Sequence, residues 1–176
     1  MSKLKSPEPA KLISSMFSTD RELLGEILGE LSEKYGRTDF ISEFILFDYT
    51  DYYTKEMGQS LVRRFVSFEN LVRPESLPGI KIFTNSLEEK YSSNDKRRTN
   101  IDPGYISKHN LILATGKNYA HRPYLGNGIY ADLTLIYRNK TFQPLEWTYP
   151  DYAEKNIMEM FNRIREKYLA QLKLER

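Results

Sequence analysis

The sequence predicts an α+β fold: a ferredoxin-like β-α-β-β-α-β start, added antiparallel strands and a C-terminal docking helix, arranged as a two-layer sandwich. Three observations lead to this prediction. Apolar residues recur at helical spacing in 19–35 and 151–172, they alternate with polar residues in 128–137, and turns containing Pro or Gly separate the strand-like runs. Residues 1–9, with two prolines and two lysines, are expected to form a flexible arm, and residues 10–176 a single domain.

The first half of the chain supplies the β-α-β-β-α-β run. Residues 11–17 have strand character, and a capping box from Thr19 to Glu22 is expected to start a helix that ends at Gly36. The later elements of this run are strands over 40–48 and 61–72, a helix over 79–91, and a strand over 99–106 that ends in a turn at Asp102-Pro103-Gly104.

The second half adds strands and the last helix. Residues 109–115 are expected to be a fully buried strand, and Gly126-Asn127-Gly128 supplies the positive φ angles of a tight hairpin turn. A second capping box, from Asp151 to Glu154, is expected to start the last helix, with Trp147 and Tyr149 before it as core anchors. The apolar stripe that docks this helix is Ile157, Met160, Phe161, Ile164, Tyr168 and Leu172.

The composition excludes several classes of function. The chain has no cysteine, which excludes disulfides, iron-sulfur clusters, thiolate zinc sites and a cysteine nucleophile. A net charge of +2 is too small to favour the backbone of a nucleic acid or an anionic membrane, so neither is an expected partner. No segment approaches about 18 consecutive apolar residues and no apolar stretch follows the first lysines, so a cytoplasmic protein is expected. The 13 tyrosines indicate half-buried sheet faces or a polar aromatic pocket.

Several segments combine into a long and specific pattern: FTNSLE (83–88), NIDPGYI (100–106), ILATGKNYAHRPYLGNGIYADLTLIY (112–137) and WTYPDY (147–152). They resemble the bacterial family catalogued as domain of unknown function 4416. The segments KLISSMFSTDRELL and FDYTDYYTKEMG are similar to the opening of that family, so the resemblance covers nearly the whole chain. The family has no established activity, and the resemblance therefore implies no reaction and no cofactor. A phosphate-binding P-loop is absent, because Leu111 stands at the first glycine position and Asn118 follows the lysine.

The main site candidate is the loop 116–124, which leaves the end of a buried strand. Backbone amides beside Gly116 can face a phosphate or carboxylate, a guanidinium can contact an oxyanion at two points, and an imidazole can titrate near neutral pH. The alternative is a plain hairpin connection with solvated cations and a structural histidine. The predicted site side chains of the loop are Lys117, Asn118, Tyr119, His121, Arg122 and Tyr124, the two tyrosines as walls for a ring.

Two carboxylates could complete this site. Asp102 precedes the strand 109–115 and Asp132 lies on the polar face of the strand 128–137, so both could converge on His121. Such a set could orient a general base or bind a divalent metal. No ligand pair has helical or other fixed spacing, so no metal site is predicted.

Arg63 and Arg64 are expected to point to opposite faces of their strand. Whichever arginine is buried needs a partner, and Glu43 or Glu69 could form a structural ion pair with it. The alternative is an arginine that faces the ligand pocket, and Arg64 is the candidate for that role.

These residues leave three hypotheses. The first is binding of an anionic small molecule or nucleotide, bearing a phosphate or carboxylate, in a Lys/His/Arg/Tyr pocket around 116–124. The second is a hydrolase or phosphodiesterase that uses His121 with Asp102 or Asp132. The third is a non-catalytic interaction module that presents tyrosines to a protein partner. The sequence does not decide whether the protein is an enzyme, and it specifies no cofactor.

Overall fold

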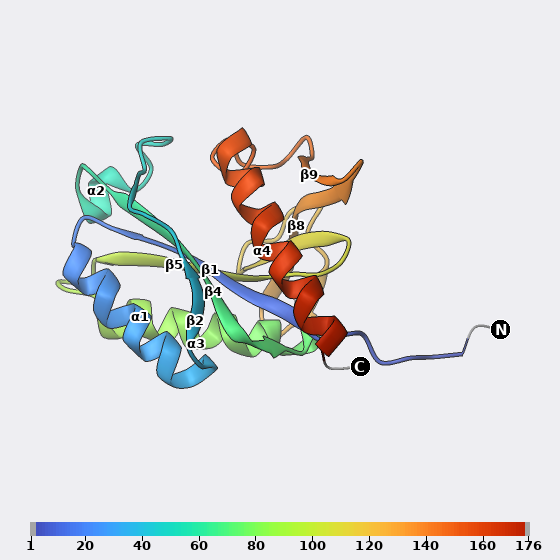
Figure 1. Cartoon of the computed structure of the whole chain (residues 1–176). Coiled ribbons are helices and arrows are strands. Elements are labelled where there is room, and N and C mark those ends of the chain that lie inside the picture. Colours follow the sequence, from blue (N-terminus) through green and yellow to red (C-terminus); the bar gives the residue numbers. More distant parts are fainter. Residues whose placement is uncertain (1–2, 175–176) are drawn as a thin grey trace.

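A computed structural model describes residues 3–174, and within them the chain forms four α-helices and a nine-stranded antiparallel sheet (Figure 1). The helices are α1 (Arg21–Tyr35), α2 (Thr54–Met57), α3 (Leu77–Lys90) and α4 (Lys155–Leu174), and a 3-10 turn, η1 (Pro74–Ser76), precedes α3. The strands are β1 (Ala10–Ser18), β2 (Thr38–Ile41), β3 (Ile45–Leu46), β4 (Val62–Val72), β5 (Thr99–Ile106), β6 (Asn110–Thr115), β7 (Tyr124–Gly126), β8 (Ile129–Arg138) and β9 (Thr141–Pro144).

The predicted order of the first six elements is present as β1-α1-β2-β4-α3-β5, with the short β3 added. In the sheet the strands follow the order β2-β4-β1-β5-β6-β8-β7, while β3 pairs with β4 and β9 pairs with β8. Strands that a helix connects are therefore not neighbours, because β4 lies between β1 and β2 and β1 lies between β4 and β5. The predicted strand 40–48 is divided into β2 and β3.

Helices cover both faces of the sheet, whereas the predicted two-layer sandwich has helices on one face only. Leu12 and Met16 of β1 pack with α1 and α3, whereas Ile13 packs with α4. Figure 1 shows α4 on the side of the sheet opposite to α1 and α3. Successive residues of a strand point to opposite faces, so β1 is apolar on both and all nine of its residues are buried. The stripe of α4 is buried at all six predicted positions, but a helical stripe alone does not say which face of the sheet it covers.

Two predicted helix starts are wrong. Asp20 rather than Thr19 caps α1, because its carboxylate accepts the amide hydrogens of Glu22 and Leu23 at 3.0 and 3.1 Å. The second capping box does not form, and α4 begins only at Lys155.

The predicted turn at Asp102-Pro103-Gly104 is also wrong, because β5 continues through it, paired with β1. Alternation along the strand points the nitrogen of Pro103 away from β1. Pairing with β6 begins only at the next residue, Gly104, so the missing N–H of Pro103 lies where the ladder has already ended.

Before Gly104 in the chain, β5 has no hydrogen-bonded partner in β6, and this leaves a gap in the sheet. The backbone of Ile101 faces this gap, and side chains of α3 satisfy it in place of a strand. The Ile101 amide donates to the Glu88 carboxylate at 2.7 Å, and its carbonyl accepts from the Lys81 ammonium at 2.8 Å. The gap is therefore held open by polar groups, and the cavity described below lies there.

Gly104 stands at the last paired row, and Gly104→Ala is expected to lower the free energy of unfolding by about 1–3 kcal/mol. An added Cβ would lie 2.4 Å from the carbonyl oxygen of Ile112, a backbone atom that cannot turn aside. Urea denaturation measures the effect. Gly79→Ala is the matched control, since nothing lies within 4 Å of its added Cβ in α3. Equal stability of the two variants would contradict this account of the gap.

Residues 3–8 are exposed and precede β1. Residues 1–2 and 175–176, which belong to the predicted arm and domain, lie outside the described residues. Across 3–174, the helices are too short or too polar to cross a lipid bilayer.

Candidate functional site

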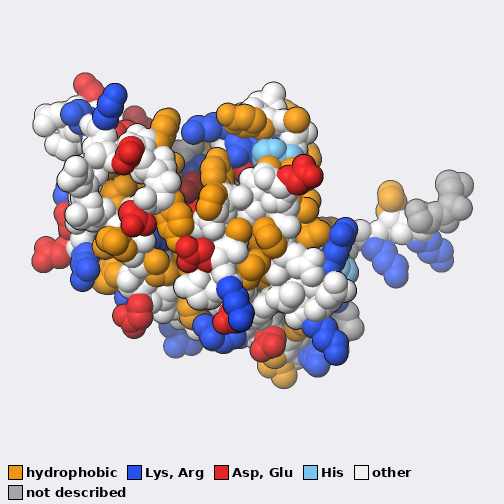
Figure 2. All heavy atoms as spheres, turned by 90° about the horizontal axis from the view of Figure 1, so that it is seen from above, with side chains coloured by type: hydrophobic (Ala, Val, Ile, Leu, Met, Phe, Trp, Pro, Cys, Tyr) orange, Lys and Arg blue, Asp and Glu red, His pale blue; other side chains and the backbone are white. Residues whose placement is uncertain are grey.

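A cavity of about 630 Å³ lies over the gap between β5 and β6. Its walls come from the segment 47–53, from 149–152, from α3 and from the start of the loop after β6. Figure 2 looks onto this face of the molecule, where orange hydrophobic side chains border a hollow between two lobes. The volume suits a small organic molecule.

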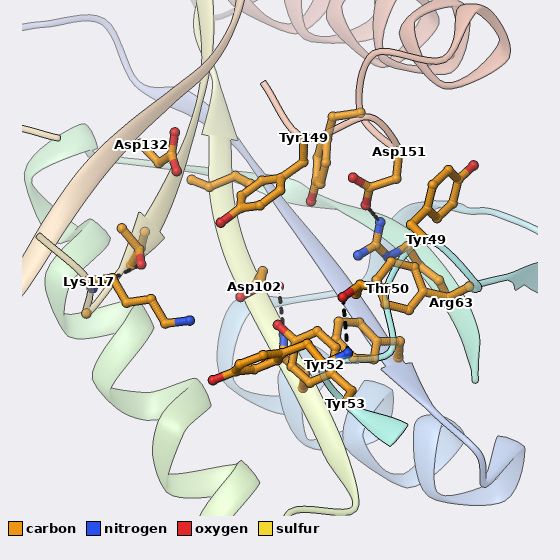
Figure 3. A pocket seen from close by; sticks show the side chains of 18 of the residues that line it. Tyr49, Thr50, Tyr52, Tyr53, Arg63, Asp102, Lys117, Asp132, Tyr149 and Asp151 are labelled. Carbon is orange, nitrogen blue, oxygen red and sulfur yellow. Dashed lines mark hydrogen bonds and ion pairs between the residues drawn. The ribbon is translucent and has the colours of Figure 1, made fainter. Parts of the chain in front are cut away.

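Tyrosines dominate the aromatic part of the wall. Burial, together with the nearby Asp102 carboxylate, raises the pKa of Tyr53 to about 12, so its hydroxyl keeps its proton at pH 7. Figure 3 shows Tyr149 above the open centre of the pocket and Tyr52 with Tyr53 below it. The wall tyrosines are Tyr49, Tyr52, Tyr53, Tyr149 and Tyr152.

Most of the cations on the wall are already paired with carboxylates. The Arg122 guanidinium lies 2.7 Å from the Asp132 carboxylate, and both side chains are buried. Arg63 forms a buried ion pair with Asp151. The two remaining pairs are Lys81 with Asp102 at 3.5 Å and Arg97 with Glu56 at 2.8 Å.

Lys117 differs from these four cations. Among residues 3–174, no carboxylate forms an ion pair with it. Its ammonium lies 5.1 Å from the centre of the Tyr52 ring, on the cavity wall. The remaining wall carboxylate, Glu88, lies 3.6 Å from Arg97, and burial raises its pKa. The positive charge of Lys117 is therefore the one on this wall that lacks a local counter-ion.

The structure brings four of the predicted site residues to the cavity wall: Lys117, Arg122, Asp102 and Asp132. The Arg122 side chain donates to Asp132, to the Lys117 carbonyl and to the Tyr149 hydroxyl, so its guanidinium joins three segments of the wall. Asp132 therefore pairs primarily with Arg122, and its carboxylate lies farther from His121.

His121 lies beside this wall rather than on it. Its ring stacks on Trp147, with centroids 4.8 Å apart and an interplanar angle of 13°. Its Nε2 atom is buried, 3.6 Å from a carboxylate oxygen of Asp132, and has no hydrogen-bond partner among the described residues. Asp102 is not in contact with it; its carboxylate accepts from Asn100.

The other predicted loop residues do not line the cavity. Asn118 is exposed, and so are Tyr119 and Tyr124, at 61% and 62%. The Arg122 guanidinium lies over the Tyr119 ring at 4.8 Å, while Tyr124 packs against Tyr130 beside the hairpin turn.

Of the two arginines in β4, Arg63 faces the cavity and Arg64 does not. Arg64 lies over the Phe44 ring at 4.2 Å and donates to the carbonyl of Ser42. The predicted acidic partners are wrong, because Arg63 pairs with Asp151, and Glu69 pairs with Arg37.

The tyrosines on the wall were not predicted as site residues. Trp147 and Tyr149 are 39% and 52% exposed, so they are not core anchors as predicted. The Trp147 indole donates to the carbonyl of Leu133 and covers His121. The signal that could have identified the other wall is the interleaved Asp and Tyr of FDYTDYY (47–53), which pairs ring surface with polar groups.

Comparison with known proteins gives one match. A family model described as Domain of unknown function (DUF4416) matches residues 8–168. No curated protein and no solved structure matches the chain.

Proposed function

Because the chain belongs to the DUF4416 family, whose description names no activity, we propose a function from the cavity itself: it binds a small anionic molecule. The class includes phosphate-bearing or carboxylate-bearing compounds and nucleotides. One observation carries the proposal, namely the ammonium of Lys117 without a counter-ion on a wall where the other cations are paired.

The position of Lys117 supports this proposal physically. The residue lies two positions after the end of β6, and its amide donates to the Thr115 hydroxyl at 3.1 Å, which fixes the first turn of the loop. Lys117 itself is exposed, so its ammonium lies where the cavity opens and an anion can reach it from solvent. Its attraction for an anion is correspondingly sensitive to salt. In this proposal Arg122 has a structural role, because its hydrogen bonds to Asp132 and Tyr149 hold the wall in place.

The hydrolase hypothesis has less support. His121 is stacked beneath Trp147 and does not line the cavity, so a bound molecule would not meet its imidazole directly. Asp132, its proposed orienting group, is held by Arg122. The exposed rings of Tyr119 and Tyr124 suit the interaction-module hypothesis, but they lie outside the cavity.

The expected result for Lys117→Gln is a loss of affinity for anions by about 10–150-fold, the equivalent of one charge-assisted hydrogen bond of about 1.5–3 kcal/mol. Titration calorimetry with phenyl phosphate, benzoate and adenosine monophosphate measures it, at low salt because the attraction is screened. Lys140→Gln is the matched control, since this exposed lysine lies in the turn between β8 and β9. Equal binding by both variants, or no binding to the wild type, would contradict the proposal.

We also propose that β1-α1-β2-β4-α3-β5 is a ferredoxin-like unit. It is supported by the order β2-β4-β1-β5, in which each helix joins two strands separated by a third, as in a split β-α-β unit.

A further inference from the structure

We infer that the anion bound in this cavity carries a planar ring, which stacks on the tyrosines of opposite walls. This inference rests on the proposed function and adds the shape of the ligand. The class is therefore aryl or nucleobase-bearing phosphates and carboxylates, and not sugar phosphates or aliphatic acids.

Tyr52 provides one wall. Tyr52 is 65% exposed although it lines the cavity, and the ring surface that the Lys117 ammonium does not cover is open to a ligand. The neighbouring Tyr53 ring meets it edge to face, at 4.9 Å and 87°, and Tyr53 is held in turn against Phe17 at 4.9 Å. The ring is thereby supported by packed aromatic groups.

Tyr149 provides the opposite wall. It is 52% exposed, and its hydroxyl accepts from the buried Arg122 guanidinium at 3.4 Å. Pro150 follows it and restricts the backbone of Tyr149 to extended conformations. Figure 3 shows this ring across the open centre of the pocket from Tyr52.

The place of the charge relative to these rings selects the ligand class. The Lys117 ammonium lies 5.1 Å from the centre of the Tyr52 ring, so an anion bound there is adjacent to the stacking surface. A phosphate or carboxylate attached close to a flat ring can meet Lys117 while the ring lies on Tyr52. A puckered aliphatic ring places hydrogens above and below its mean plane, so its contact with the tyrosine face is less extensive than that of a flat ring.

The test uses two probes of equal carbon number, phenyl phosphate and cyclohexyl phosphate, titrated calorimetrically into the wild-type protein at about pH 8.5. This pH is well above the second phosphate pKa of about 6, so both probes are dianions. Stacking on an aromatic side chain is expected to make phenyl phosphate bind about fivefold tighter or more. Equal affinity for the two phosphates would overturn the planar-ring inference and leave the proposed function intact. Failure of both to bind would overturn the two together.

Substitutions of the wall tyrosines test whether these rings cause the preference for phenyl phosphate. Tyr52→Leu and Tyr149→Leu are expected to reduce the ratio of the two affinities toward one, while Tyr52→Phe keeps the ring and the ratio. Tyr124→Leu is the matched control, because this tyrosine is 62% exposed and lies outside the cavity. Thermal melting verifies that each variant is folded. Leucine variants that keep the wild-type ratio would overturn the inference.

Discussion

Asp39→Asn is expected to lower the free energy of unfolding by about 3–5 kcal/mol at pH 7, because it leaves a buried ammonium without its carboxylate. The Lys11 side chain has no exposed surface, and it reaches Asp39 of β2 from β1. The ammonium also donates to the Phe68 carbonyl at 2.8 Å, and Asp39 accepts from the Ser67 hydroxyl. Burial lowers the pKa of Lys11. In the variant the buried amine can therefore release its proton and become neutral, which limits the loss of stability.

Urea denaturation of Lys11→Met/Asp39→Asn provides the control for this prediction. The double variant removes both charges and is expected to be more stable than Asp39→Asn alone. Burial opposes ionisation of Asp39, but hydrogen bonds from Lys11 and Ser67 outweigh it and lower its pKa. A lowered carboxylate pKa contributes stability above the ordinary value of about 3.9, and that contribution is lost as pH falls through the folded-state pKa. A single variant as stable as the wild type at pH 7 would refute the account.

Asp151→Asn is expected to cost about 3–5 kcal/mol for the same reason, applied to a guanidinium. Arg63 is only 5% exposed and lies 4.1 Å from the centre of the Phe47 ring and 5.3 Å from that of Phe17, rings that offer no hydrogen-bond acceptor in place of the carboxylate. Its Nε atom already has no hydrogen-bond partner among the described residues, so the loss of Asp151 leaves the charge poorly compensated.

The comparison variant for Asp151 is Glu154→Gln, three residues further on. Glu154 accepts from the exposed Tyr49 hydroxyl and is expected to contribute less than about 1 kcal/mol. The loss of stability that urea unfolding measures for each variant distinguishes two possible roles of Asp151. An N-cap, which the sequence suggested, would cost about 1 kcal/mol, whereas a buried ion-pair partner costs several times as much. Equal losses for the two variants would rule out the ion-pair role.

The elements of the fold that could be predicted are those with a strong period in the sequence. The stripe of α4 follows directly from which residues face an apolar layer. The predicted alternation in β8 holds only as far as Leu133, because a register shift follows it. Ile129 therefore packs with Leu77 of α3, while Leu135 packs with α4 on the other face.

Local turn and cap signals failed where a distant partner competed for the same residue. Asp151 has the spacing of a cap, but Arg63, 88 residues away in the chain, binds its carboxylate. Asp102-Pro103-Gly104 has the composition of a turn, but β1 pairs with it as a strand.

The site could be predicted from the sequence only where its residues lie close together in the chain. Lys117 could be found because a lysine beside a glycine at the end of a buried strand is a feature of one short segment. Tyr52 and Arg63, which also line the cavity, come from a part of the chain that only the sheet order brings near. Strand parity shows that Arg63 and Arg64 face opposite sides. It does not show on which side the cavity lies, and the structure places Arg63 rather than the predicted Arg64 on the cavity wall.

The gap between β5 and β6 divides the sheet into two half-sheets that share only the rows from Gly104 to Ile106. Tyr52 follows β3 at the edge of one half-sheet, whereas Lys117 follows β6 in the other. A molecule that contacts both residues spans the division and acts as a cross-link. Relative twisting of the two halves would then be damped by the bound molecule, and the protein would be mechanically stiffer with its ligand than without it.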